Sequence, residues 1–170
     1  MKVVIDTNIL ENMLNPSKNR NAYLTEMVSK IVARQTTVCL DAGERIDNQY
    51  HGRLGVCIAR AKESVARQIL QFFIAAGTVP YPHQERHEVD KTDDLMKCIG
   101  RQIPLEEDLD RVLVYVAARA GATLITDDYD HILSEDGERE EKLKQCAATY
   151  ANTTLELMNS HRAKAMLDNL

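Results

Sequence analysis

Three acidic residues stand where α/β proteins commonly place ligand-binding groups. Asp6 directly follows the apolar run KVVI, and Asp128 lies just past the apolar run ATLIT. Asp110 opens the helix that is predicted before the second run. Three close carboxylates repel one another and raise each other's pKa values, so such a cluster is costly unless a cation sits in it. Hard oxygen ligands without Cys or His select Mg²⁺ or Mn²⁺, and such an ion can activate water for attack on a phosphodiester.

Smaller polar groups beside these acids would complete the site. Asn8 and Thr126 are expected to orient the carboxylates or a phosphate. Asp130 either reaches the ion through water or caps the turn that follows, and the sequence favours neither role. The alternative for the whole set is structural, with Asp6 capping the next helix and the other acids in solvated turns.

The acids would be positioned by one helix and two buried strands. Residues 2–5 predict a first, central strand, and residues 122–126 predict a strand that is buried on both faces. Before the second strand, apolar residues recur as one helical stripe: Leu109, Val112, Leu113, Val116, Ala117 and Ala120. Gly121 follows the stripe, where a helix end requires a residue that accepts the left-handed conformation. Parallel strands place ligand sites at their carboxyl ends, so we expect the three acids in one crevice.

The rest of the chain predicts a single α/β domain, residues 1–170, with three α/β/α layers around a mostly parallel sheet. Apolar spacing predicts further elements, namely helices at residues 22–34, 58–77, 93–98 and 160–170 and strands at residues 35–40 and 153–157. Asp41 and Glu44 fit a capping box before another helix, and Ser160 is placed to cap the terminal one.

Composition and charge limit the class of protein. The chain has 170 residues, of which 44% are hydrophobic and 28% charged, as in a folded globular protein. No apolar run approaches the roughly 20 residues that cross a bilayer, so we expect no membrane association. The net charge of −5 argues against a protein that coats nucleic acid by bulk charge, but not against a nucleic-acid enzyme. Cys39, Cys57, Cys98 and Cys146 are widely spaced, which predicts reduced core thiols of a cytoplasmic protein and argues against a zinc site.

Two segments of the chain resemble the PIN-domain nucleases. VVIDTNIL opens the chain, and DRVLVYVAARAGATLITDDYD runs from Asp110 to Asp130. That family has a strand ending in Asp-x-Asn and, near its end, an Asp, a helix, a Gly, a strand and Thr-x-Asp-x-Asp. The matching positions here are Asp6 and Asn8 for the first motif, and Asp110, Gly121, Thr126, Asp128 and Asp130 for the second. The resemblance covers the first ten residues and about 25 near the end, with a weaker piece between them.

The resemblance implies a fold, an activity and partners. It implies a PIN-like α/β/α sheet and a ribonuclease that uses Mg²⁺ or Mn²⁺ to cleave phosphodiester bonds in RNA. Many bacterial and archaeal members of the family are toxins of toxin–antitoxin pairs. An antitoxin protein is therefore a further expected partner, and so is a second copy of the chain in a homodimer.

The chain departs from the family at one position of the site. PIN domains usually carry a fourth acid, a Glu directly before an aromatic residue, and the matching position here is Gln49, before Tyr50. On a helix, Gln49 lies nearer the apolar face marked by Ile46 and Tyr50, while Asp47 lies on its other side. Either Gln49 faces the metal, or Asp47 substitutes for the missing acid; we favour Gln49.

Basic residues follow the Gln49 segment and have two interpretations. Arg53 and Arg60, with neighbouring cations, either line an RNA groove or form a solvated face. The later residues 79–104 hold three of the four prolines and predict a loop. Because of those prolines, we do not expect His83 and His87 to form a helical metal site.

Two other functions remain open at this point. A degenerate PIN domain would bind RNA or a partner without cutting, and Gln49 supports it. An aspartyl phosphotransferase of the haloacid-dehalogenase type would use Asp6 as its nucleophile. That family has Asp-x-Asp where this chain has Asn8, and it has a Lys before the later acids, for which we find no suitably placed residue.

Overall fold

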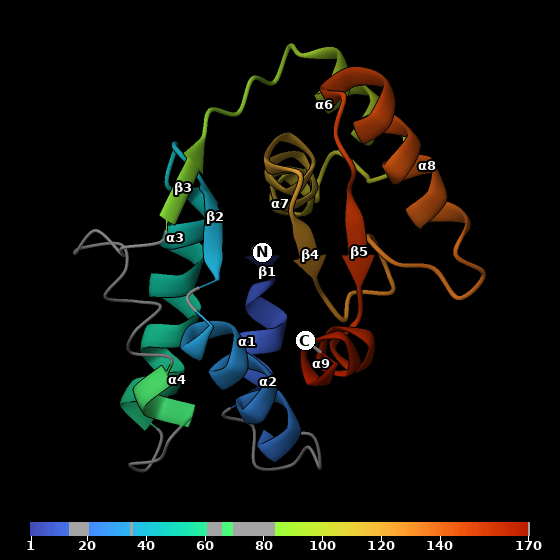
Figure 1. Cartoon of the computed structure of the whole chain (residues 1–170). Helices are drawn as coiled ribbons and strands as arrows, with labels where there is room; N and C mark the ends of the chain where they lie inside the picture. Colours follow the sequence, from blue (N-terminus) through green and yellow to red (C-terminus); the bar gives the residue numbers. More distant parts are fainter. Residues whose placement is uncertain (14–20, 35, 61–65, 70–83, 170) are drawn as a thin grey trace.

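The computed structural model describes residues 1–13, 21–34, 36–60, 66–69 and 84–169. At its centre lies a sheet of five parallel strands in the order β3-β2-β1-β4-β5 (Figure 1). The strands are β1 (Lys2–Ile5), β2 (Thr37–Asp41), β3 (Gln84–His87), β4 (Thr123–Ile125) and β5 (Glu156–Met158). The predicted central position of the first strand and the parallel sheet are confirmed.

Helices cover both faces of this sheet. The helical segments are α1 (Thr7–Met13), α2 (Asn21–Ala33), α3 (Arg45–Gln49), η1 (Tyr50–Leu54), α4 (Gly55–Arg60), α6 (Asp94–Ile99), α7 (Asp108–Ala120), α8 (Glu138–Cys146), η2 (Ala147–Ala151) and α9 (Ser160–Asp168). The step from β1 to β2 runs toward one edge of the sheet, and the step from β3 to β4 runs toward the other. Right-handed crossovers therefore place α1 and α2 on one face and α6 and α7 on the opposite face. The predicted three-layer α/β/α fold is thus confirmed.

Burial explains why the central elements form as the sequence predicts. The apolar residues of β1 and the whole of β4 are buried, as expected for strands covered on both faces. Helix α7 has eight buried residues, because it packs against the sheet on one side and against α6 and η2 on others. It ends at Gly121, whose φ of 59° is left-handed and whose N–H reaches the carbonyls of Ala117 and Ala118. A side chain at position 121 would strain this turn.

Three elements, β3, α8 and the short η2 that continues α8, were not predicted. Strand β3 lies in a segment that was expected to be a loop. A loop was expected because the residues QERH are polar and lack the apolar alternation of a strand. Helix α8 was not predicted because its segment is polar. It buries only Leu143 and Cys146, so it shows no apolar stripe. The long helix expected at residues 58–77 falls largely outside the described residues.

Two predicted caps are corrected by the structure. Asp41 does cap the start of α3, accepting bonds from the backbone N–H groups of Arg45 and Ile46 at 2.9 Å each. Glu44 does not reach back as a capping box requires, since it adopts a left-handed φ of 58° and makes no side-chain cap bond. At α9 the cap is the side chain of Asn159 rather than Ser160, which begins the helix itself.

One pair of cysteines is oxidised. Cys98 in α6 and Cys146 at the end of α8 form a disulfide, whereas Cys39 and Cys57 are free. The prediction of four reduced thiols is therefore wrong for this pair. The two residues lie 48 positions apart, and the packing of α6 against α8 brings them together, which sequence spacing does not reveal. Within the described segments, no helix is long and apolar enough to cross a bilayer.

Candidate metal centre

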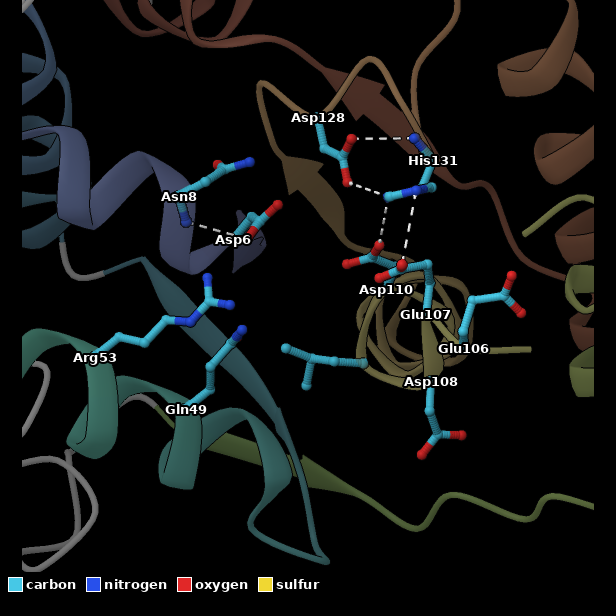
Figure 2. A pocket seen from close by; sticks show the side chains of 11 residues that line it. Asp6, Asn8, Gln49, Arg53, Glu106, Glu107, Asp108, Asp110, Asp128 and His131 are labelled. Carbon is cyan, nitrogen blue, oxygen red and sulfur yellow. Dashed lines mark hydrogen bonds and ion pairs between the residues drawn. The ribbon is translucent and has the colours of Figure 1, made fainter. Parts of the chain in front are cut away.

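An open cavity of about 310 Å³ lies at the carboxyl ends of the central strands. The chain leaves β1 toward one edge of the sheet and continues from β4 toward the other, so β1 and β4 flank the topological switch point where parallel sheets bind ligands. The cavity is lined by Asp6, Asn8, Gln49, Arg53, Glu106, Glu107, Asp108, Leu109, Asp110, Asp128 and His131 (Figure 2). The structure thus brings Asp6, Asp110 and Asp128 together as expected.

Asp6 is held rigidly at the end of β1. Only 6% of the residue is exposed. One carboxylate oxygen accepts the hydroxyl of Thr126 at 2.7 Å, and the other accepts the backbone N–H of Asn8 at 3.2 Å. The Thr126 hydroxyl also accepts the backbone N–H of Asp128 at 3.0 Å, so it ties the ends of β1 and β4 together. Burial raises the pKa of Asp6, because the ionised form has lost most of its contact with water.

Asp110 and Asp128 share a histidine that neither sequence motif predicts. The Nδ1 atom of His131 lies 3.4 Å from one oxygen of Asp110 and 3.4 Å from one oxygen of Asp128. Its Nε2 atom lies 3.7 Å from an oxygen of Glu107 (Figure 2). Burial, followed by repulsion from Asp128, Asp6 and Glu107, raises the pKa of Asp110 to about 7, and His131 opposes this rise.

A tight turn after Asp128 explains how the histidine reaches the acids. One oxygen of Asp128 accepts the backbone N–H groups of Asp130 and His131, at 2.9 Å and 3.0 Å. The turn folds the imidazole of His131 back over the cavity. Asp130 is exposed and does not line the cavity, so the structure separates it from the other acids. Glu107 comes three residues before Asp110, and this helical spacing is the signal that could have identified it.

The position that matches the family's fourth acid faces the cavity but carries no charge. Gln49 lines the cavity, and its side-chain oxygen accepts the hydroxyl of Thr7 at 2.5 Å. Asp47 is buried elsewhere and accepts a bond from the Arg86 guanidinium at 2.5 Å. Gln49 therefore occupies the expected place, and Asp47 is engaged outside the cavity. Figure 2 shows Gln49 and Arg53 projecting toward the cavity from the same helical segment.

Only part of the predicted basic strip is described. Arg53 lines the cavity, and 57% of its side chain is exposed. It lies 3.8 Å from Glu11, which is a loose contact for an ion pair. The side chain of Arg60 lies outside the described part of the chain.

The donor set of the cavity fits a divalent cation. Among the described residues, six carboxylates line the cavity, against one guanidinium and one imidazole. The side-chain oxygen of Asn8 is buried and has no hydrogen-bond partner among the described residues, which leaves a free acceptor beside the acids. Glu107, Asp110 and His131 each offer one ligand atom within 4.8 Å of the others. The imidazole of His131 therefore lies beside the oxygen donors that the sequence predicts.

The chain matches no protein-family model, no curated protein and no solved structure. The resemblance to PIN-domain nucleases rests on the two motifs and on the placement of their acids.

Proposed function

We propose that this chain is a metal-dependent endoribonuclease of the PIN type, using Mg²⁺ or Mn²⁺. One observation carries the proposal. Asp6, Asp110 and Asp128 come from three elements that are far apart in the sequence, and they line one cavity at the switch point of a parallel sheet. Such a cluster destabilises the free protein through like-charge repulsion, which a bound divalent cation would relieve.

The ligands of the ion would come from the acids of this cavity. Asp6, Asp110 and Asp128 would hold it, with Glu107 and His131 completing the set. When bound, such an ion activates water and stabilises the charge that develops on the phosphate. The surrounding residues have distinct tasks that follow from their contacts.

Thr126 fixes the direction of the Asp6 carboxylate through its 2.7 Å hydrogen bond. The free side-chain oxygen of Asn8 would accept a bond from a water in the site. Arg53 is the cation of the cavity wall, and its guanidinium would pair with a phosphate of the substrate. Binding of a divalent cation favours the ionised form of Asp110, which its neighbours otherwise oppose.

RNA is the substrate that we propose for this site. The cavity is open to solvent, as a phosphodiester chain requires, and it combines acids for metal with one exposed arginine for phosphate. A toxin that is inhibited by an antitoxin protein is the biological setting we propose from the resemblance to the PIN family. A haloacid-dehalogenase mechanism has less support, since the described residues that line the cavity include no lysine.

A second candidate is a PIN-like domain that binds RNA without cutting it. Gln49 favours this candidate, because a neutral amide bonded to Thr7 replaces the usual carboxylate. Glu107 argues for retained metal binding, because it adds a carboxylate from the opposite wall of the same cavity.

Cleavage of RNA by Asp6 variants separates these candidates. Wild-type protein with millimolar Mn²⁺ should cleave a single-stranded RNA, and EDTA should stop cleavage. Asp6→Asn is nearly isosteric and removes only a ligand charge, so cleavage should fall by at least about a hundredfold while the circular dichroism spectrum stays unchanged. The matched control is Asp130→Asn, an exposed acid outside the cavity lining, which should retain activity. Full activity in Asp6→Asn would refute the assignment of Asp6, and wild-type binding of RNA without cleavage would favour the second candidate.

A further inference from the structure

A cluster of a thiol, a carboxylate and an imidazole lies on the sheet away from the acidic cavity. Cys39 in β2 is paired in register with Glu85 in β3. His87 is two residues beyond Glu85, so its side chain leaves the strand on the same face. Cys39 and Glu85 are 46 positions apart in the sequence, and only the parallel pairing of β2 with β3 makes them neighbours.

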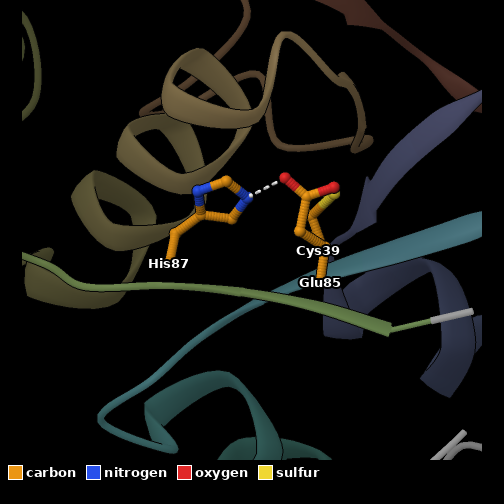
Figure 3. Close-up of side chains that lie close together, drawn as sticks. All are labelled: Cys39, Glu85 and His87. Atoms are coloured by element: carbon orange, nitrogen blue, oxygen red, sulfur yellow. Dashed lines mark ion pairs between the residues drawn. The ribbon is translucent and has the colours of Figure 1, made fainter.

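The three side chains converge on one point. The thiol sulfur of Cys39, a carboxylate oxygen of Glu85 and a ring nitrogen of His87 all lie within 4.8 Å of one another (Figure 3). The Nε2 atom of His87 is buried and lies 3.0 Å from an oxygen of Glu85, but this contact does not have hydrogen-bond geometry. A buried nitrogen without a hydrogen bond is costly in a folded protein unless another partner satisfies it.

We propose that Cys39, Glu85 and His87 form a binding site for Zn²⁺ that joins the edge strand β3 to β2. Sulfur, imidazole nitrogen and carboxylate oxygen are the three donor types that zinc accepts in proteins. The thiolate of Cys39 is a soft donor that is absent from the described lining of the acidic cavity, so the two sites would select different ions. The wide spacing of the cysteines argues only against a zinc site with several cysteine ligands. This site would use one cysteine, and its other ligands come from another strand.

The fourth zinc position would be filled by water. The side chains of Glu85 and His87 are 35% and 17% exposed, whereas Cys39 is fully buried. Solvent therefore reaches the cluster from the Glu85 side. Three protein ligands with one water satisfy the tetrahedral preference of zinc.

In the free protein, the ammonium of Lys2 pairs with the carboxylate of Glu85. Its ammonium lies 2.7 Å from one oxygen of Glu85 and 2.9 Å from the other. Burial raises the pKa of the Cys39 thiol to about 12, so the free protein keeps a neutral thiol. Zinc binding would release the thiol proton, and the resulting thiolate and the Glu85 carboxylate would balance the two charges of the ion. The ammonium of Lys2 would then turn to solvent, since 40% of its side chain is already exposed.

Cobalt serves as the probe for this site, because Co²⁺ replaces Zn²⁺ and a thiolate bound to it gives a charge-transfer absorption band. Full-length protein that has been treated with a chelator and dialysed should develop this band on titration with Co²⁺, and Zn²⁺ should abolish the band by competition. Zinc should also raise the melting temperature, since it binds only the folded pairing of β2 and β3.

Matched variants identify the ligands. Cys39→Ser and His87→Gln should each weaken Co²⁺ binding by at least about tenfold, and Cys39→Ser should remove the thiolate band altogether. Cys57→Ser is the control for the other free thiol and should keep the band. Asp128→Asn is the control for the acidic cavity and should keep it as well, so failure of this proposal and failure of the proposed nuclease function are distinguishable.

Any one of three results overturns the proposal. Wild-type protein that gives no thiolate band with Co²⁺ has no such site. A band that persists in Cys39→Ser shows that another sulfur supplies the ligand. Because Cys39 is buried and its substitution can unfold the protein, His87→Gln provides the same test at a partly exposed position. Unchanged Co²⁺ affinity in folded His87→Gln would also refute the site.

Discussion

Replacement of Asp110 by asparagine tests the electrostatic argument for the acidic cavity. Burial and the neighbouring acids raise the pKa of this carboxyl from 3.8 to about 7. The pKa of Asp110 is higher in the folded state than in the unfolded state, so the folded state binds this proton more tightly. The free energy of unfolding therefore falls as the pH rises from about 4 through 7. Asparagine preserves the shape and cannot ionise, so Asp110→Asn should lose this part of the pH dependence.

The size of the effect follows from the two pKa values. A carboxyl with these values removes about 2.6 kcal/mol from the free energy of unfolding between about pH 5 and about pH 8. Asp110 shares its repulsion with Asp6 and Asp128, and 15% of its side chain reaches solvent. Both facts reduce the contribution of Asp110 alone to the pH dependence of the free energy of unfolding. We therefore expect wild type to lose about 1 to 2.5 kcal/mol more than Asp110→Asn over this pH range.

Urea unfolding at these two pH values, in EDTA, measures the difference. Asp130→Asn is the control, because this acid is exposed and lies outside the cavity lining, and it should behave as wild type. Saturating Mn²⁺ should reverse the order at the higher pH, since the ion stabilises wild type more than a variant that lacks a ligand charge. Equal pH dependence in wild type and Asp110→Asn would refute the reasoning. So would a variant that is less stable than wild type at the higher pH without metal.

The same cavity sets the expected response to metal. Millimolar Mn²⁺ or Mg²⁺ should raise the melting temperature by mass action, and Asp128→Asn should weaken that rise; an unchanged wild-type melting curve would count against the site. Gln49→Glu should lower the stability of the metal-free protein and reduce the Mn²⁺ concentration needed for cleavage, because it adds a fourth like charge that the ion neutralises. Asp47→Asn should lower the melting temperature by removing the charge that pairs with Arg86, yet leave the metal response unchanged. His131→Asn should narrow the preference for Mn²⁺ over Mg²⁺ in titrations, because imidazole suits Mn²⁺ better; equal ratios in both proteins would exclude His131 as a ligand.

Three acids of the cavity, Asp6, Asp110 and Asp128, were predictable because their placement follows from their positions along the elements. Asp6 and Asp128 directly follow strands whose apolar sequence marks them as buried, and parallel strands carry their carboxyl ends to one edge. The stripe of α7 and the left-handed Gly121 likewise follow from local rules. Position along an element was therefore enough to place these residues near one another.

The thiol, carboxylate and imidazole cluster was not predictable, because it depends on an unrecognised strand. The residues QERH of β3 have no apolar alternation, and the strand exists because β2 supplies its hydrogen bonds at the sheet edge. A reader of the sequence who does not recognise β3 cannot pair it with β2. The neighbours of Cys39, Glu85 and His87, then stay hidden. The disulfide of Cys98 was missed for a similar reason, since it depends on how two short helices pack.

His131 shows why the chemistry of a site needs more than the positions of its acids. Its ring reaches Asp110 and Asp128 only because two backbone N–H groups bond to the Asp128 carboxylate and close the turn. On the sequence alone, the neutral Gln49 suggests a site that is short of one acid. In the structure, Glu107 and His131 add donors on the α7 side of the cavity, while Gln49 is bonded to Thr7. The centre of negative charge therefore lies nearer α7 than the family pattern implies, and the ion should sit where an imidazole can join its ligands.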